Sequence, residues 1–169
     1  MRLLTVLFMA VTVMFTSSCG PSSQDRPPTD DEATMQPTSL TVTEAARIAA
    51  GYVSTILDKP VDPNPALARK IGCRTDEALM SVGPPWKVQV YEWIRDPAPE
   101  LVEAVFDRIH ALVGEGFEPV PWTRPDPEPP NDKTYRDARG YVVFAKAENR
   151  GSDGYVLTVR ATSPCANDD

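Results

Sequence analysis

The residues of this chain that could act as acids, bases or nucleophiles are one histidine, several closely spaced carboxylates and three cysteines. A general base needs a nucleophile or an acid partner held within hydrogen-bonding distance. His110 has no such partner nearby in the sequence, and the motifs G-x-S-x-G, H-E-x-x-H and C-x-x-C do not occur. Glu92, Glu100, Glu103 and Asp107 could in principle form an acid–base pair. Glu103 and Asp107 are four residues apart on a predicted helix, where a solvated acidic face is ordinary, and chance pairs are expected among 24 acidic residues. These residues therefore do not predict an enzyme.

Cys19 follows a pattern that is typical of an export signal. One basic residue, Arg2, precedes a predominantly apolar run over residues 3–15, and small polar residues at 16–18 come directly before the cysteine. A charged start, an apolar middle and small residues at the cleavage point are the parts of a secretory signal peptide. As a helix the run of about 13 residues spans roughly 20 Å, less than the ~30 Å hydrocarbon core of a bilayer. We therefore predict a signal peptide over residues 1–18 in place of a transmembrane helix.

Cleavage directly before a cysteine resembles the lipobox of bacterial lipoproteins. Ser18 and Cys19 fit that motif, and Thr16 occupies a position that is usually leucine in the family. The resemblance implies that the Cys19 thiol carries a diacylglyceryl group and that Cys19 is the first residue of the mature protein. Each buried acyl CH₂ contributes about 0.8 kcal/mol, so two long chains would anchor the protein firmly to the cell membrane. The open alternative is a plain secretory signal, cleaved near Ser18 or later, that leaves Cys19 as a free thiol.

With Cys19 assigned to lipid, Cys73 and Cys165 remain as an even pair in an exported protein. We predict a disulfide between them, which would attach the C-terminal strand to the region after the first helix. It would close a loop of about 90 residues and stabilise the fold by up to roughly 4.5 kcal/mol on the chain-entropy model. A metal site is the alternative, but two cysteines and one histidine are too few ligands and have no recognisable spacing. We expect no metal and no cofactor.

Composition limits the classes of partner. The chain carries a net charge of −7, and an acidic domain is repelled by phosphate backbones, so we do not expect nucleic acid binding. Residues 19–40 contain almost no large apolar side chain, which predicts a disordered tether behind the lipidated cysteine. The remaining residues, 41–169, are enough for one domain with its own core.

Apolar periodicity predicts the elements of this domain. Thr41 and Glu44 form a capping box that starts a helix over 42–58, and a second helix over 99–113 ends at Gly114. One or two short helical turns are expected over 66–80, around Cys73, and a proline-rich loop over 124–138. Alternation and turn residues predict the strands, the last two joined by the turn NRGSDG. The predicted strands cover 86–95, 117–123, 140–148 and 155–162.

The order of these elements favours an α+β fold, because the apolar face of each helix must be buried against one face of a sheet. We predict a two-layer sandwich with about four mostly antiparallel strands and two main helices on one face. Pro119 and Pro121 alternate along 117–123 and remove hydrogen-bond donors on the same side of that strand. This places the strand at an edge of the sheet.

The strand over 86–95 carries the candidate binding surface. Its alternation places Trp86, Val88, Val90 and Ile94 on one face and Lys87, Gln89, Tyr91, Trp93 and Arg95 on the other. If helices cover only the Trp86 face, two large aromatic rings stand in water, and exposed aromatic patches usually mark binding surfaces. The open alternative is that the first helix or the segment 66–80 packs over these rings.

Together these observations predict a small lipoprotein on the extracytoplasmic face of the cell membrane. It resembles the small surface lipoproteins of Gram-positive bacteria whose roles are unassigned. We expect a non-enzymatic binding or accessory module of the cell envelope, with a protein, glycan or lipid as partner. One alternative is an envelope hydrolase that uses carboxylates, which requires a deep pocket lined by two or more acids. Another is a structural subunit of a membrane complex, which requires a large exposed apolar patch.

Overall fold

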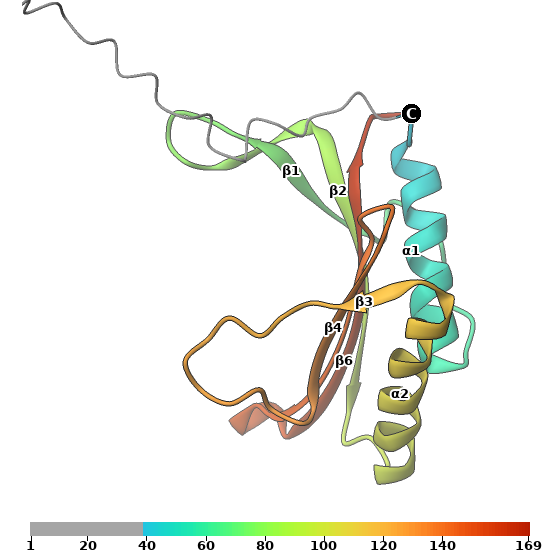
Figure 1. Cartoon of the computed structure of the whole chain (residues 1–169). Helices are drawn as coiled ribbons and strands as arrows, with labels where there is room; N and C mark the ends of the chain where they lie inside the picture. Colours follow the sequence, from blue (N-terminus) through green and yellow to red (C-terminus); the bar gives the residue numbers. More distant parts are fainter. Residues whose placement is uncertain (1–38) are drawn as a thin grey trace, which may run out of the picture. The chain divides into compact units, whose positions relative to one another are not determined.

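The computed structural model describes residues 39–169, so the predicted signal peptide, Cys19 and nearly all of the predicted tether lie outside the described part. Six antiparallel strands form one sheet in the order β1-β2-β6-β5-β4-β3, and both helices lie on the same face of it (Figure 1). The α+β class is therefore confirmed. The expected number of about four strands is wrong, because two further segments of the chain join the sheet.

The two helices begin and bury their apolar faces largely as the pattern predicts. α1 (Val42–Leu57) starts at Thr41, whose hydroxyl accepts a hydrogen bond of 3.3 Å from the backbone N–H of Glu44. Four buried alanines on its inner face allow α1 to lie close to β2 and β6. α2 (Pro99–Ala111) packs over β5 and β4 through Val102, Val105 and Ile109, and a short 3₁₀ helix, η1 (Leu112–Glu115), follows it.

Two long strands lie at the centre of the sheet, β2 (Ser81–Arg95) and β6 (Tyr155–Ala166). β5 (Val142–Asn149) pairs with β6 through the predicted hairpin, whose connection holds a 3₁₀ turn, η2 (Gly151–Asp153). β3 (Phe117–Pro119) lies at the sheet edge, as its prolines predict, but it ends at Pro119 well before the predicted Thr123. Pro121 has no N–H to continue the pairing with β4.

Two segments expected outside the sheet are strands. The helical turns expected over 66–80 are wrong, because residues there form β1 (Arg69–Thr75), which pairs antiparallel with β2. A Cβ atom at Gly72 would overlap the backbone of Val82, so this close strand contact requires glycine. The loop expected over 124–138 is wrong at its end, where β4 (Asp132–Asp137) pairs with β5. Both strands pair with the next strand along the chain across short connections, 76–80 and 138–141, but their own residues lack the apolar alternation on which the prediction depends.

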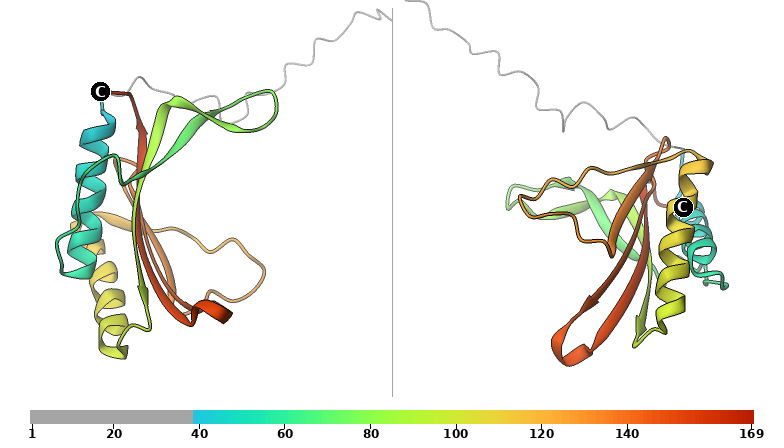
Figure 2. Two further views of the ribbon diagram at one scale, coloured as in Figure 1. Left: turned by 180° about the vertical axis from the view of Figure 1, so that it is seen from behind. Right: turned by 60° about the horizontal axis from the view of Figure 1, so that its bottom comes forward.

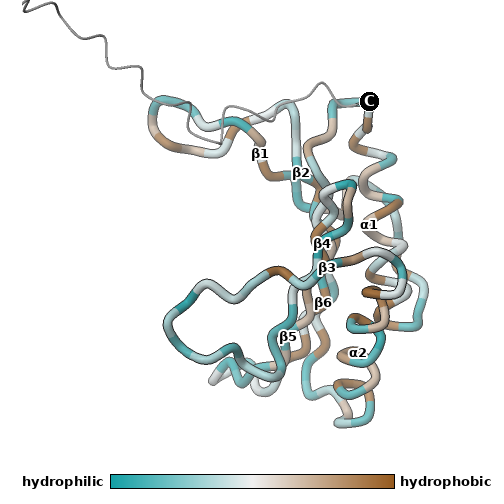
Figure 3. The backbone as a smooth tube through the Cα atoms, viewed as in Figure 1, coloured by the Kyte–Doolittle hydropathy of each residue, from teal (hydrophilic) through white to brown (hydrophobic). Residues whose placement is uncertain are grey.

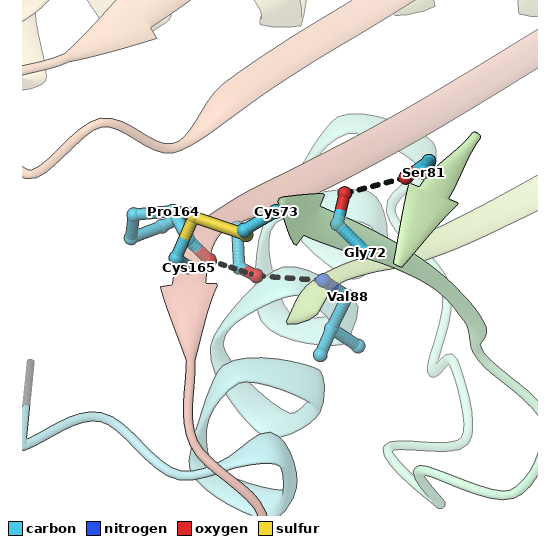
Figure 4. Close-up of a disulfide and its surroundings, with 7 residues drawn as sticks. Gly72, Cys73, Ser81, Val88, Pro164 and Cys165 are labelled. Atoms are coloured by element: carbon cyan, nitrogen blue, oxygen red, sulfur yellow. Dashed lines mark hydrogen bonds between the residues drawn. A yellow bond between two sulfur atoms is a disulfide. The ribbon is translucent and has the colours of Figure 1, made fainter. Parts of the chain in front are cut away.

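The disulfide and a buried serine lie where the pairing of β2 with β6 is irregular. Cys73 of β1 and Cys165 of β6 form the predicted disulfide, with their Cα atoms 6.2 Å apart (Figure 4). The β2–β6 register shifts between Lys87 and Gln89. There the backbone N–H of Val88 donates to the Ser163 hydroxyl at 2.8 Å, and that hydroxyl donates to the Pro164 carbonyl at 2.7 Å. A side chain thus replaces the missing ladder bond and leaves no buried donor unpaired.

A buried carboxylate organises the turn between β4 and β5. Asp137 accepts hydrogen bonds from the backbone N–H groups of Arg139 (3.0 Å) and Tyr141 (2.8 Å). It also accepts from the Tyr52 hydroxyl of α1 (3.1 Å) and from the Arg139 guanidinium (3.0 Å). The turn is therefore tied to α1, and the carboxylate is fully used in structure.

Tyr141, at this turn, makes the stability of the fold depend on pH in the alkaline range. Its ring is buried, and its hydroxyl has no hydrogen-bond partner within residues 39–169. Burial, opposed in part by the charge of Arg139, raises the pKa of Tyr141 to about 12. Because tyrosine in the unfolded chain titrates near pH 10, this contribution to stability is fully present below about pH 10. It is lost as the pH rises to about 12.

Tyr141→Phe is expected to leave the free energy of unfolding at pH 7 unchanged or to raise it by up to about 1 kcal/mol. Above pH 10 the variant should lose less stability than the wild type. Part of the wild-type loss should remain, since burial also raises the pKa of Tyr52. Urea unfolding between pH 7 and 12 measures both effects, with Tyr155→Phe as an exposed control. Parallel loss of stability in Tyr141→Phe and the wild type above pH 10 would contradict this account.

The second face of the sheet carries no helix. Two projections, the β1–β2 hairpin and the segment 120–131, extend from the sheet on the side opposite the helices (Figure 2). The segment 120–131 is predominantly hydrophilic (Figure 3). The helix-free face is thus bordered by chain segments but is not covered by a packed layer.

Candidate functional site

The helix-free face of the sheet, called the open face below, carries the predicted binding residues. Val88 and Val90 of β2 are buried toward the helices, so the alternate residues of β2 point to the open face. Tyr91 is 52% exposed and Trp93 is 44% exposed. Because α1 packs on the other face and residues 69–75 pair beside β2, neither covers the two rings. The predicted surface residues that share this face are Lys87, Gln89, Tyr91, Trp93 and Arg95.

The register of the sheet adds residues of β6 and β5 to this surface. Tyr91 lies opposite Arg160, Trp93 lies opposite Thr158, and Arg160 lies opposite Phe144 on its other side. Directly opposed side chains of antiparallel strands share a face, with Cβ atoms about 4.5–5.5 Å apart. The guanidinium carbon of Arg160 is 4.5 Å from the centroid of the Phe144 ring. The centre of the open face is therefore a row of Tyr91, Arg160 and Phe144.

Two further arginines border this row near Trp93. The guanidinium carbon of Arg150 lies 4.8 Å from the centroid of the Trp93 ring, a cation–π contact, and its Nε donates to Glu148 at 2.8 Å. Arg95 forms an ion pair of 3.6 Å with Asp153. These contacts hold one face of the Trp93 ring and leave nearly half of the side chain in solvent.

Arg160 is a half-buried cation without a counter-ion in the described part of the chain. Lys146, on β5, has two acidic partners, Asp132 at 3.6 Å and Glu148 at 2.7 Å. Within residues 39–169 the Arg160 side chain forms no hydrogen bond or ion pair, although it is partly withdrawn from water. Burial lowers the pKa of Arg160, the charge of Asp132 opposes this shift, and the charge of Arg69 adds to it. A half-buried guanidinium without a carboxylate partner costs solvation energy that an anion would restore.

The open face is positive, whereas the chain as a whole is negative. Along each strand, the residues that alternate with the buried core residues belong to the open face. They include six basic and three acidic residues, whereas the net charge of the chain is −7. Charge of one sign gathered on one surface attracts ligands of the opposite sign. The basic residues are Arg69, Lys87, Arg95, Arg136, Lys146 and Arg160, and the acidic residues are Glu118, Asp132 and Glu148.

A separate cleft of about 370 Å³ lies beside β3 and β4 and contains the single histidine. His110 Nδ1 lies 3.0 Å from the hydroxyl of Tyr135, and Glu128 forms an ion pair of 2.8 Å with Lys133. Trp122 lines the same cleft, and its indole N–H donates to a backbone carbonyl of the segment 120–131. His110 and Glu128 are thus each bonded to another residue of the cleft, and Glu128 is the one carboxylate in its lining.

Two further properties concern only residues 39–169. No group of three or more histidine, cysteine, aspartate or glutamate side chains is placed there to hold a metal ion. None of the helices in that part is both long enough and apolar enough to cross a membrane.

The structure brings some of the sequence-predicted site residues together. It gathers the five predicted surface residues on one face of β2 and joins Cys73 to Cys165, whereas Cys19 lies outside the described residues. Sequence reasoning missed Arg160 and Phe144 as members of the surface, because their place depends on the order β2-β6-β5. A signal for Arg160 exists in the sequence, since Leu157, Val159 and Ala161 alternate with it as core residues.

Comparisons of the chain with protein-family models, with curated proteins and with solved structures gave no match.

Proposed function

We propose that the protein is a lipoprotein of the cell envelope, held at the extracytoplasmic face of the cell membrane through Cys19, and that its open face binds an envelope partner without converting it. The observation that carries this proposal is the exposure of Tyr91 and Trp93 on a sheet face that no helix covers. Burial of large aromatic rings is a main source of binding energy, and soluble domains seldom leave such rings gathered in water without a partner.

The predicted tether supports this function. A flexible segment of about 20 residues has a root-mean-square length of roughly 25 Å. A domain held at that distance from its lipid anchor would be free to turn its open face toward a partner. The lipid would supply retention at the membrane, so the open face would not need a high affinity of its own.

Two alternative functions would require other surface features. A hydrolase that uses carboxylates needs two acids facing one cleft, and in the cleft beside β3 the single lining carboxylate, Glu128, is paired with Lys133. A structural subunit of a membrane complex needs a large continuous apolar patch. The aromatic and basic composition of the open face favours a binding module over both.

Replacing Tyr91 and Trp93 together by alanine is expected to reduce binding to envelope material at least about tenfold, because central aromatic anchors commonly contribute more than 1 kcal/mol each. The full-length protein would be held by its own anchor in a supported bilayer. Separated glycan, protein and lipid fractions of the envelope would then be passed over it, and bound mass recorded.

Val113→Ala is the matched control, since Val113 is an exposed apolar residue of η1, outside the open face. It should bind each fraction as the wild type does. The proposal fails if no fraction binds the wild type. It also fails if the Tyr91→Ala/Trp93→Ala variant, shown to be folded by circular dichroism, binds equally well.

A further inference from the structure

The side chains of the open face favour a negatively charged ligand. Arg160 presents a planar guanidinium with five N–H donors, and its contact with Phe144 occupies a ring face but uses none of these donors in a conventional hydrogen bond. No carboxylate of residues 39–169 forms an ion pair with it; the charge of Asp132 acts on Arg160 at longer range, but Asp132 forms its ion pair with Lys146 on the neighbouring strand, at 3.6 Å. The fork of an arginine side chain matches a carboxylate or a phosphate through paired hydrogen bonds. A ligand anion would complete this arrangement.

The aromatic neighbours of Arg160 favour a ring-shaped ligand with an apolar face. Tyr91 lies directly opposite Arg160, and Trp93 lies on the diagonal. The corresponding Cβ separations in antiparallel sheets are about 4.5–5.5 Å and about 7–8 Å. A ligand that covers an aromatic ring and also reaches the guanidinium must therefore carry its charge within about one sugar ring of its apolar face. The C–H face of a pyranose packs on tyrosine or tryptophan, and a carboxylate or phosphate on that ring lies at such a distance.

The remaining neighbours match sugar hydroxyl groups. Gln89, Thr158 and Thr162 point to the open face beside the aromatic row, and the Gln89 amide donates to the Thr162 hydroxyl at 3.2 Å. An amide and a hydroxyl each both donate and accept hydrogen bonds, and this pair retains further capacity for a ligand. Such groups serve a partner rich in hydroxyls, whereas an acyl chain would leave them unpaired.

We propose that the open face binds an acidic glycan, with a sugar ring on Tyr91 or Trp93 and the acid group of the glycan on Arg160. This inference rests on the proposed binding function and adds the chemical class of the ligand. A peptide that extends a sheet would pair with the backbone of an edge strand, whereas this surface lies over the central strands β2, β6 and β5. A flat bilayer would meet the β1–β2 hairpin and the segment 120–131 before it reached the surface (Figure 2).

The test compares acidic sugars with their neutral forms on the full-length protein. The probes are a glucuronate-containing oligosaccharide, its carboxyl-reduced form, a phosphorylated oligosaccharide and its dephosphorylated form. We expect at least one acidic probe to bind, with its neutral form at least about tenfold weaker, and the affinity to fall as salt is added. The two acidic probes distinguish a carboxylate from a phosphate as the recognised group.

Arg160→Gln is expected to weaken binding of the acidic probe roughly tenfold to a hundredfold, since a charge-assisted pair is lost. Arg160→Lys should retain part of the affinity because it keeps the charge but not the fork. Arg47→Gln is the matched control, since Arg47 is an exposed cation of α1, outside the open face. Thermal unfolding would establish that each variant is folded before its affinity is compared.

Several outcomes would overturn the inference. It fails if neither acidic probe binds, if neutral forms bind equally well, or if folded Arg160→Gln binds as the wild type does. It also fails if hexaglutamate, or phosphatidylglycerol vesicles added to the Cys19→Ser protein, binds more tightly than every glycan probe. The proposed function would survive any of these results, provided that Tyr91→Ala/Trp93→Ala still loses binding to an envelope fraction.

Discussion

Replacing Cys73 and Cys165 together by serine is expected to lower the free energy of unfolding by about 2–5 kcal/mol. The two residues are 92 positions apart in the chain, so the disulfide closes a long loop and restricts the unfolded state strongly. In the folded state it joins β1 to β6, the two strands that flank β2. β1 is an edge strand that pairs with β2 on one side only and has a register shift after Gly72, so the disulfide supplies its covalent attachment to β6.

Urea unfolding of the wild type and the double variant measures this loss directly. Adding a thiol reductant to the wild type should shift its midpoint to that of the variant, and the reductant should leave the variant unchanged. Amide hydrogen exchange is expected to increase most along Arg69–Thr75, because β1 loses its covalent attachment. Equal unfolding midpoints for the oxidised wild type and the variant would show that the disulfide does not stabilise the fold.

Cys19→Ser is expected to release the protein from the membrane fraction of cells into the soluble fraction. Serine has no thiol to receive the diacylglyceryl group that the lipobox resemblance implies. Two long acyl chains at about 0.8 kcal/mol per buried CH₂ hold the wild-type protein firmly at the membrane, so the predicted change in distribution is large.

Fractionation of cells and mass spectrometry of the native protein test the anchor together. The expected mass is that of the chain from Cys19 onward with acyl groups attached. The Cys73→Ser/Cys165→Ser variant is the matched control, because it loses thiols elsewhere and should stay with the membrane. An unmodified thiol at position 19, or an intact leader sequence in the native protein, would refute the anchor and the location derived from it.

Local sequence patterns predicted the helices and strands that are determined by interactions between residues close in the chain. The capping pair Thr41 and Glu44 starts α1, and the apolar stripe of α2 predicts which residues it buries. Pro119 indicates an edge strand, and the glycine-rich turn predicts the β5–β6 hairpin. β1 and β4 were not predictable in the same way, because their residues do not alternate between apolar and polar, and such a mixed segment becomes a strand only when a strand of the sheet offers its hydrogen bonds.

For the candidate site as well, the sequence predicted one part and the tertiary structure decided the other. Alternation alone determined that Tyr91 and Trp93 share a face with Lys87, Gln89 and Arg95, because successive side chains of any strand point to opposite sides. Only the tertiary structure decided that both helices cover the other face, and that Arg160 and Phe144 lie beside Tyr91. Strand order and helix placement depend on contacts between residues far apart in the chain, and no property of a single segment encodes them.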